Sequence, residues 1–107
     1  MPHYMVQAAY TPESWATQVK NPQDRAEALR PIIERLGGKL LSMYLAFGDY
    51  DVVGLAEMPD NVSSAAFSMA VSAGGGVRAI KTTPLMTLQE AAEAMRKAGQ
   101  AGYRPPT

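Results

Sequence analysis

The sequence predicts an α+β domain in which an antiparallel four-stranded sheet carries helices on one face. Two apolar runs of strand length, 40–47 and 52–58, flank a short polar stretch and are typical of a β-hairpin. One run of strand-forming residues, 3–10, precedes the hairpin, and another, 77–83, follows it. Amphipathic stretches separate these runs, so the expected order is β-α-β-β-α-β, the order of a ferredoxin-like plait.

The N-terminal strand, 3–10, leads directly into a helix. Thr11 suits the N-cap of this helix and Pro12 its first position. Asn21-Pro22 breaks the helix, because proline cannot continue one normally. A second helical piece is expected over about 23–36.

This second piece has an apolar stripe and an internal proline. Pro31 predicts a kink or a local break, because its ring would clash with the carbonyl of Glu27. Gly37-Gly38 is expected to end the helix. The residues expected to be buried are Ala26, Leu29, Ile33 and Leu36.

The hairpin sets the faces of the sheet. A two-residue loop at Asp49-Tyr50 places Gly48 opposite Asp51, and Gly48 can adopt the positive φ that tight turns need. Because side chains alternate along a strand, one face is wholly apolar and should lie under the helices. The expected helix-covered set is Leu41, Met43, Leu45, Phe47, Val52, Gly54, Ala56 and Met58. The expected open set is mixed: Ser42, Tyr44, Ala46, Val53, Leu55 and Glu57.

A second major helix is expected after Asp60, which suits its N-cap, and before the glycines 74–76. Its expected buried face is Val62, Ala66, Met69, Ala70 and Ala73. The strand 77–83 follows, with Pro84 at its end or at a sheet edge.

The pattern Thr87-Leu88-Gln89-Glu90 matches a capping box and predicts a C-terminal helix from Leu88 to about Ala98, stopped by Gly99. Residues 1–99 therefore form one expected domain, and 100–107 an extended tail.

Several blocks in order resemble the GYD domain family. The central block is Gly48-Asp49-Tyr50-Asp51-Val52-Val53, and the others are 36–40, 57–60, 65–67 and 76–78. The resemblance implies a ferredoxin-like fold of the dimeric α+β barrel type, here with an extra C-terminal helix. It also implies a bacterial protein without an assigned reaction, and it supplies no catalytic residues.

The mixed sheet face is too apolar to remain fully exposed to solvent, because it carries Tyr44, Val53 and Leu55. We therefore expect self-association, as a homodimer or a higher oligomer in which two sheets face each other.

Composition excludes several classes of function. Ten basic and ten acidic residues balance, so neither nucleic acid nor a membrane is an expected partner. The absence of cysteine excludes disulfides and thiolate chemistry, and a single histidine excludes a multi-histidine metal site within one chain. No cofactor is expected. No apolar stretch is long enough to span a bilayer and no signal-peptide pattern is present, so a cytoplasmic location is expected.

The candidate site residues each have a structural alternative. His3 suits an acid or base, but a lone histidine at a strand start is more often exposed or hydrogen-bonded. Tyr50 and Asp51 suit the mouth of a ligand pocket, but Asp51 is more readily explained by bonds to turn amides. Glu57, like Lys81, suits a cavity or a partner, with an interfacial ion pair or solvation as the alternative.

Trp15 and Tyr44, with Tyr10, suit an aromatic cavity for a flat organic ligand, although ordinary packing explains any one of them. Two functions therefore stay open. The first is a small oligomeric protein that binds a small organic ligand at the sheet. The second is a cofactor-independent enzyme, monooxygenase-like or isomerase-like, for a small aromatic or carbonyl compound; it rests on analogy of fold.

Overall fold

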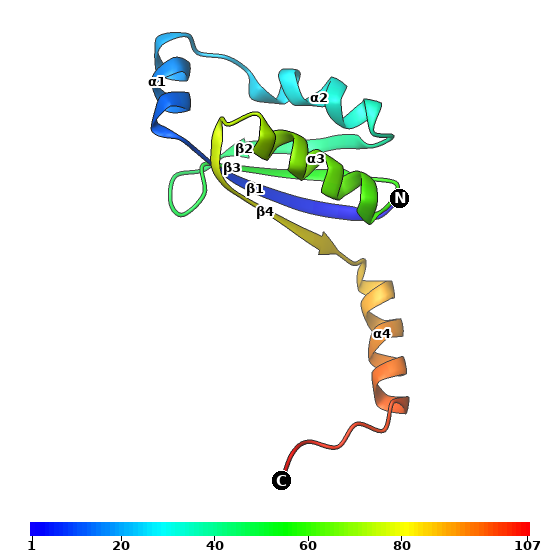
Figure 1. The fold of residues 1–107 in the computed structure, drawn as a ribbon. Coiled ribbons are helices and arrows are strands. Elements are labelled where there is room, and N and C mark those ends of the chain that lie inside the picture. The colour runs from blue at the N-terminus through cyan, green and yellow to red at the C-terminus, as the bar shows by residue number, and fades with distance from the viewer.

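A computed structural model describes residues 1–107 and confirms the predicted plait with its extra C-terminal helix. The elements are β1 (His3–Tyr10), α1 (Pro12–Lys20), α2 (Arg25–Arg35), β2 (Lys39–Leu45), β3 (Val52–Glu57), α3 (Asn61–Ala73), β4 (Val77–Leu85) and α4 (Leu88–Gln100). The strands form one antiparallel sheet in the order β2-β3-β1-β4. Helices α2 and α3 cover one face, and no helix lies over the other (Figure 1).

The predicted helix starts are confirmed by side-chain caps. Thr11 accepts a hydrogen bond from the Ser14 amide at 3.0 Å, and Asp60 accepts one from the Ser63 amide at 2.8 Å. The stop predicted at Gly99 is wrong, because α4 ends at Gln100. Of the kink or local break predicted at Pro31, the break is absent, because α2 runs through this residue. Pro31 and Glu27, whose carbonyl has no amide partner at Pro31, are both exposed, so this carbonyl is open to solvent, and one helical glycine costs only about 1 kcal/mol.

The hairpin connection differs from the predicted two-residue loop. It spans residues 46–51, and the strands pair Leu45 with Val52 where the short loop would have paired Leu45 with Gly54. Gly48 does not have a positive φ. This shift of two positions keeps each side chain on its predicted face, because the period of a strand is two.

A bulge between Leu40 and Ser42 does change the faces. Leu40 is buried opposite Ala56, while Leu41, predicted to face the helices, is exposed. Leu45 and Phe47, also predicted to be covered, are 67% and 96% exposed, because Leu45 ends β2 and Phe47 lies on the longer connection. The predicted orientation of the sheet still holds, because Met43 packs against the core and Tyr44 points to the open face.

The main core lies between the covered sheet face and helices α2 and α3. Its buried residues are Tyr4, Ile33, Leu40, Met58 and Phe67. The predicted stripe of α2 is confirmed, since Ile33 is buried and Ala26, Leu29 and Leu36 pack against this core. The prediction for α3 is wrong.

Helix α3 buries Ser64 and Phe67, whereas Val62 and Met69 are 79% and 69% exposed. The helix has apolar or small residues on more than one side, and the side that buries the large Phe67 ring removes more apolar area from water. No helix in the chain has the length and apolar character needed to cross a membrane.

Candidate functional site

An apolar cavity of about 80 Å³, here called the inner cavity, lies between the covered sheet face and helices α2 and α3. Fifteen of its 18 lining residues are hydrophobic, so it favours an apolar group. Val52, Phe67, Val71 and Ile80 are among them. The polar exceptions include Arg25, whose guanidinium is the one charged group in the lining.

A wider cleft of about 540 Å³, the outer cleft, adjoins the inner cavity. It lies among α1, the start of α2 and the end of α3, and its wall is more polar than that of the inner cavity, with Thr11, Ser14 and Gln18 among its residues. Tyr10 and Arg25 line both spaces. These two side chains therefore stand at the junction between a polar entrance and an apolar interior.

Tyr10 is the last residue of β1 and is 7% exposed. Its ring meets Trp15 edge to face, with ring centroids 5.3 Å apart. Burial raises the pKa of the Tyr10 phenol; the nearby positive charge of Arg25 opposes this shift, and the Asp51 carboxylate adds to it. The phenol is therefore neutral at physiological pH and available as a hydrogen-bond donor.

Asp51 holds the end of β1 in place. A bulge after Ala9 interrupts the pairing of β1 with β4, and the Tyr10 amide donates a hydrogen bond of 2.8 Å to Asp51 Oδ2. The Asp51 amide in turn donates to the Ala8 carbonyl at 2.9 Å. Asp51 thus fixes the backbone that carries the Tyr10 ring.

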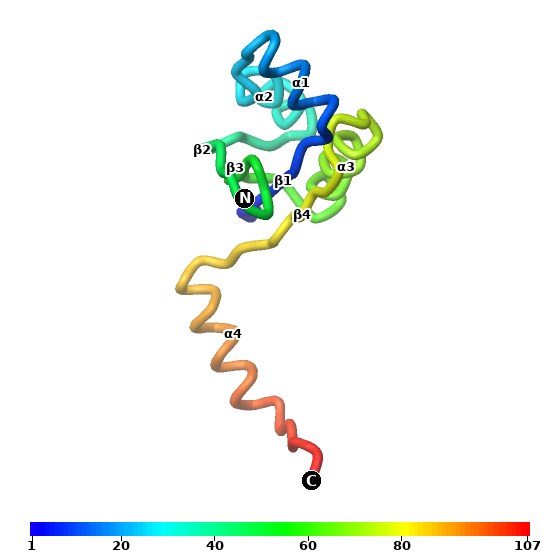
Figure 2. Tube along the Cα trace, turned by 90° about the vertical axis from the view of Figure 1, so that its left-hand side faces the viewer, coloured from blue at the N-terminus to red at the C-terminus, as the bar shows by residue number.

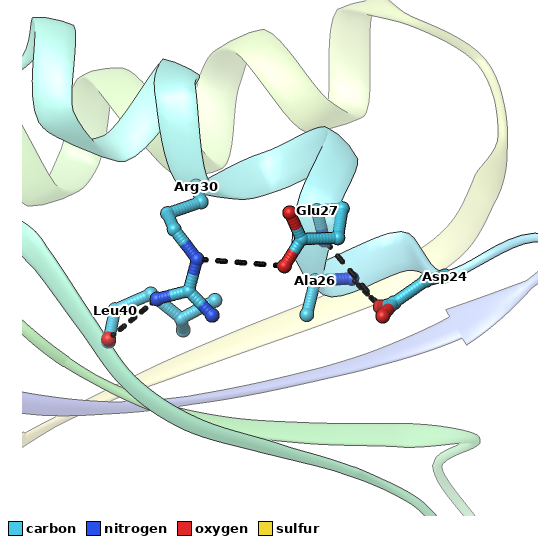
Figure 3. Close-up of polar contacts among 5 residues, drawn as sticks. All are labelled: Asp24, Ala26, Glu27, Arg30 and Leu40. Carbon is cyan, nitrogen blue, oxygen red and sulfur yellow. Dashed lines mark hydrogen bonds and ion pairs between the residues drawn. The ribbon is translucent and has the colours of Figure 1, made fainter.

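Arg25 is placed by the first turn of α2. Asp24 caps this helix and accepts from the Ala26 amide at 3.0 Å, while Arg30 donates to the Leu40 carbonyl at 3.2 Å and ties α2 to β2 (Figure 3). Arg25 itself donates to Gln23 Oε1 at 3.0 Å and has no carboxylate within 4.0 Å. Its positive charge is therefore not neutralised by an ion pair.

The model of the GYD domain family matches residues 4–95. The chain belongs to the GYD domain family. No curated protein matches it. The block 48–53, the central one of the blocks that carry the resemblance in the sequence, contains Asp51, so in this GYD domain the Asp51 carboxylate anchors the end of strand β1 at the site.

The six sequence-predicted site residues do not form one cluster. Trp15 and Asp51 both contact Tyr10, at the junction of cavity and cleft. Tyr44 is 69% exposed and lines, with Tyr10 and Arg25, a third cleft of about 280 Å³. Tyr50 is half-buried on the hairpin connection and lines none of these three spaces.

His3 and Glu57 lie away from this junction. They are opposite each other on β1 and β3, with His3 Nε2 3.4 Å from Glu57 Oε1, on the open sheet face. Neither residue lines the inner cavity, the outer cleft or the third cleft. No group of three or more His, Asp or Glu side chains is arranged to hold a metal ion.

Sequence reasoning missed Arg25 and treated Tyr10 only as part of an aromatic group. One signal for Arg25 was present. Arg25 is the first residue after the Asp24 cap, where the helix dipole disfavours a cation. An arginine at that position therefore suggests that its guanidinium interacts with a negatively charged group outside the helix.

Proposed function

We propose that this GYD-domain protein binds a small organic anion, with its apolar body in the inner cavity and its carboxylate at the junction. Arg25 supplies the charge and the Tyr10 phenol a further hydrogen bond. The observation that carries the proposal is the position of Arg25, a cation without a carboxylate partner at the mouth of an apolar cavity. A hydrogen bond between a guanidinium and a carboxylate contributes about 1.5–3 kcal/mol.

Aromatic monocarboxylates fit this site best. A flat ring fits between packed side chains, and a molecule with few rotatable bonds loses little conformational entropy on binding. Benzoate is a suitable probe, and benzamide is its uncharged counterpart. Trp15 is the only tryptophan in the chain and touches Tyr10, so its fluorescence reports occupation of the junction.

The test is a fluorescence titration, confirmed by calorimetry, of the wild-type protein and two variants. Benzoate is expected to bind more tightly than benzamide. Arg25→Gln should weaken benzoate binding by about tenfold or more and leave benzamide nearly unaffected. The matched control is Arg35→Gln, at the exposed last turn of the same helix. Equal affinity for both probes, or equal loss in both variants, would reject the proposal.

The alternative is a cofactor-independent enzyme for a small aromatic or carbonyl compound. The observation in its favour is that a neutral phenol, Tyr10, reaches the cavity and suits polarisation of a carbonyl oxygen. Against it, the lining holds no carboxylate or imidazole to act as a general base; its ionisable side chains are those of Tyr4, Tyr10 and Arg25. Exchange of the α-protons of acetophenone in D₂O, followed by NMR, tests it: exchange lost in Tyr10→Phe supports an isomerase-like activity, and a background rate excludes one.

A further inference from the structure

The outer cleft has room for more than the carboxylate of a ligand. Its volume of about 540 Å³ compares with about 80 Å³ for the inner cavity. It lies at the end of the molecule remote from α4, where α1 approaches the glycines that follow α3 (Figures 1 and 2). The Thr11 amide donates there to the Gly76 carbonyl at 3.1 Å and ties the two walls together. A ligand seated at the junction can therefore place a further group in this cleft.

Glu13 is the second charged side chain of the outer cleft, beside Arg25. It lies in the first turn of α1, three positions after Tyr10. No Lys, Arg or His side chain lies within 4.0 Å of its carboxylate, so Glu13 is not part of an ion pair. The cleft thus holds one cation and one anion, and neither is neutralised by a partner within the chain.

The end of α3 adds negative potential to the same cleft. Ala70 and Val71 near the end of this helix, and Gly74 and Gly75 after it, line the cleft. The C-terminal end of a helix carries a partial negative charge, because its last carbonyls have no partner within the helix. Helix α3 has no basic residue in its last turn to offset this charge. Glu13 and the end of α3 therefore both favour a positively charged group of a ligand.

The threonine hydroxyls of the cleft wall are engaged within α1. Thr11 Oγ1 accepts from the Ser14 amide at 3.0 Å, and Thr17 Oγ1 donates to the Glu13 carbonyl at 3.1 Å. Two of the neutral polar groups that could recognise a hydroxyl of a ligand thus already have partners. The two charged side chains are the stronger basis for selecting a ligand.

We propose that the ligand of this site is an α-amino acid with an apolar side chain. The side chain enters the inner cavity, the carboxylate meets Arg25, and the ammonium lies in the outer cleft near Glu13. This inference rests on the proposed function, because it keeps the apolar body and the carboxylate in the same places and adds the ammonium. A zwitterion matches one guanidinium and one carboxylate, whereas a simple monocarboxylate leaves Glu13 without a counterion.

Three probes with the same carbon skeleton separate the effect of charge from that of shape. 3-Phenylpropanoate, 3-phenyllactate and phenylalanine carry hydrogen, hydroxyl and ammonium, respectively, on the carbon next to the carboxylate. Their binding to the full chain is measured by Trp15 fluorescence and by calorimetry at low ionic strength, where charge interactions are least screened. Phenylalanine should bind about fivefold more tightly than either of the other two probes.

Two variants assign this advantage to Glu13. Glu13→Gln should abolish the preference for phenylalanine and leave the affinity for 3-phenylpropanoate unchanged, which also shows that the site is intact. Glu34→Gln is the matched control, because Glu34 is exposed on α2 and lines neither the inner cavity nor the two clefts; it should keep the full preference. Arg25→Gln should weaken the binding of all three probes, because each carries a carboxylate.

The outcomes separate this inference from the proposed function. Suppose that 3-phenylpropanoate binds and that Arg25→Gln weakens its binding. Phenylalanine that binds no more tightly, or a preference that survives Glu13→Gln, would then overturn the amino-acid inference alone. Equal affinity for phenylalanine and 3-phenyllactate would also overturn it, because an uncharged polar group would suffice. Absence of binding of all three probes, or binding that Arg25→Gln leaves unchanged, would reject the proposed function as well.

Discussion

Tyr10 and Asp51 are joined across 41 positions of sequence by a hydrogen bond of 2.8 Å from the Tyr10 amide to Asp51 Oδ2. The bond forms where a bulge removes Tyr10 from regular pairing with β4. It ties the hairpin connection to the end of β1, where the Tyr10 ring reaches both the inner cavity and the outer cleft. The Asp51 carboxylate, which belongs to the block 48–53, thus positions a residue of the candidate site.

Asp51→Ala should lower the free energy of unfolding by about 1–3 kcal/mol, because the Tyr10 amide loses its acceptor in a partly buried place. It should also weaken benzoate binding, because the Tyr10 ring is released. Urea denaturation and the fluorescence titration measure the two effects. Asp49→Ala, exposed on the same connection, is the control and should change stability by less than about 0.5 kcal/mol. Equal effects of the two variants would contradict this role.

Gly38→Ala should destabilise the protein by about 1–3 kcal/mol. A Cβ there would lie 2.5 Å from the Glu57 carbonyl oxygen and 3.1 Å from Ile33 Cγ2, so the α2–β2 junction would have to move. The same change at Gly48 meets nothing within 4 Å and should leave stability the same or slightly higher. Thermal unfolding of both variants measures the difference, and similar melting temperatures would show that the junction is not tightly packed.

The order of the elements and their caps was predictable because these signals are local. Thr11, Asp60 and the box at Thr87 act within one turn of their helices. The bulge at Leu41 was not predictable, because it depends on pairing between strands. The buried side of α3 depends on how the helix packs on the sheet. The placement of Tyr10 and Arg25 at one junction depends on how α2 packs on the sheet. For these three features, the sequence contained one indication, the unfavourable position of Arg25 in the helix dipole.

Gly54→Ala should stabilise the protein and weaken ligand binding. Gly54 lines the inner cavity, and a Cβ there would make ordinary contacts, 3.5 Å from the Ser42 carbonyl oxygen and 3.8 Å from Leu40 Cδ1. Replacing a strand glycine should raise the free energy of unfolding by about 0.5–1 kcal/mol. The added methyl group also reduces the room for a ring, so benzoate affinity should fall. Unchanged affinity would place the ligand outside the inner cavity.

Asp60 should make stability depend on pH in the acid range. Its hydrogen bond from the Ser63 amide lowers the pKa of the carboxyl below its ordinary 3.8. The carboxylate form therefore stabilises the fold above the unfolded pKa, and this contribution is lost as the pH falls through the folded pKa. Asp60→Asn keeps a cap but should flatten this part of the pH profile, and Asp60→Ala should lower stability at neutral pH. An Asn variant with the wild-type acid profile would contradict the assignment.

The proposed ligand enters the space between the sheet and helices α2 and α3. Intermolecular nuclear Overhauser effects between benzoate ring protons and the protein's methyl groups test it most directly. Benzoate bound in the inner cavity should show contacts to the methyl groups of Val71 and Ile80, which line this cavity. Contacts confined to Val53 and Leu55 on the open face, or none at saturating benzoate, would contradict it.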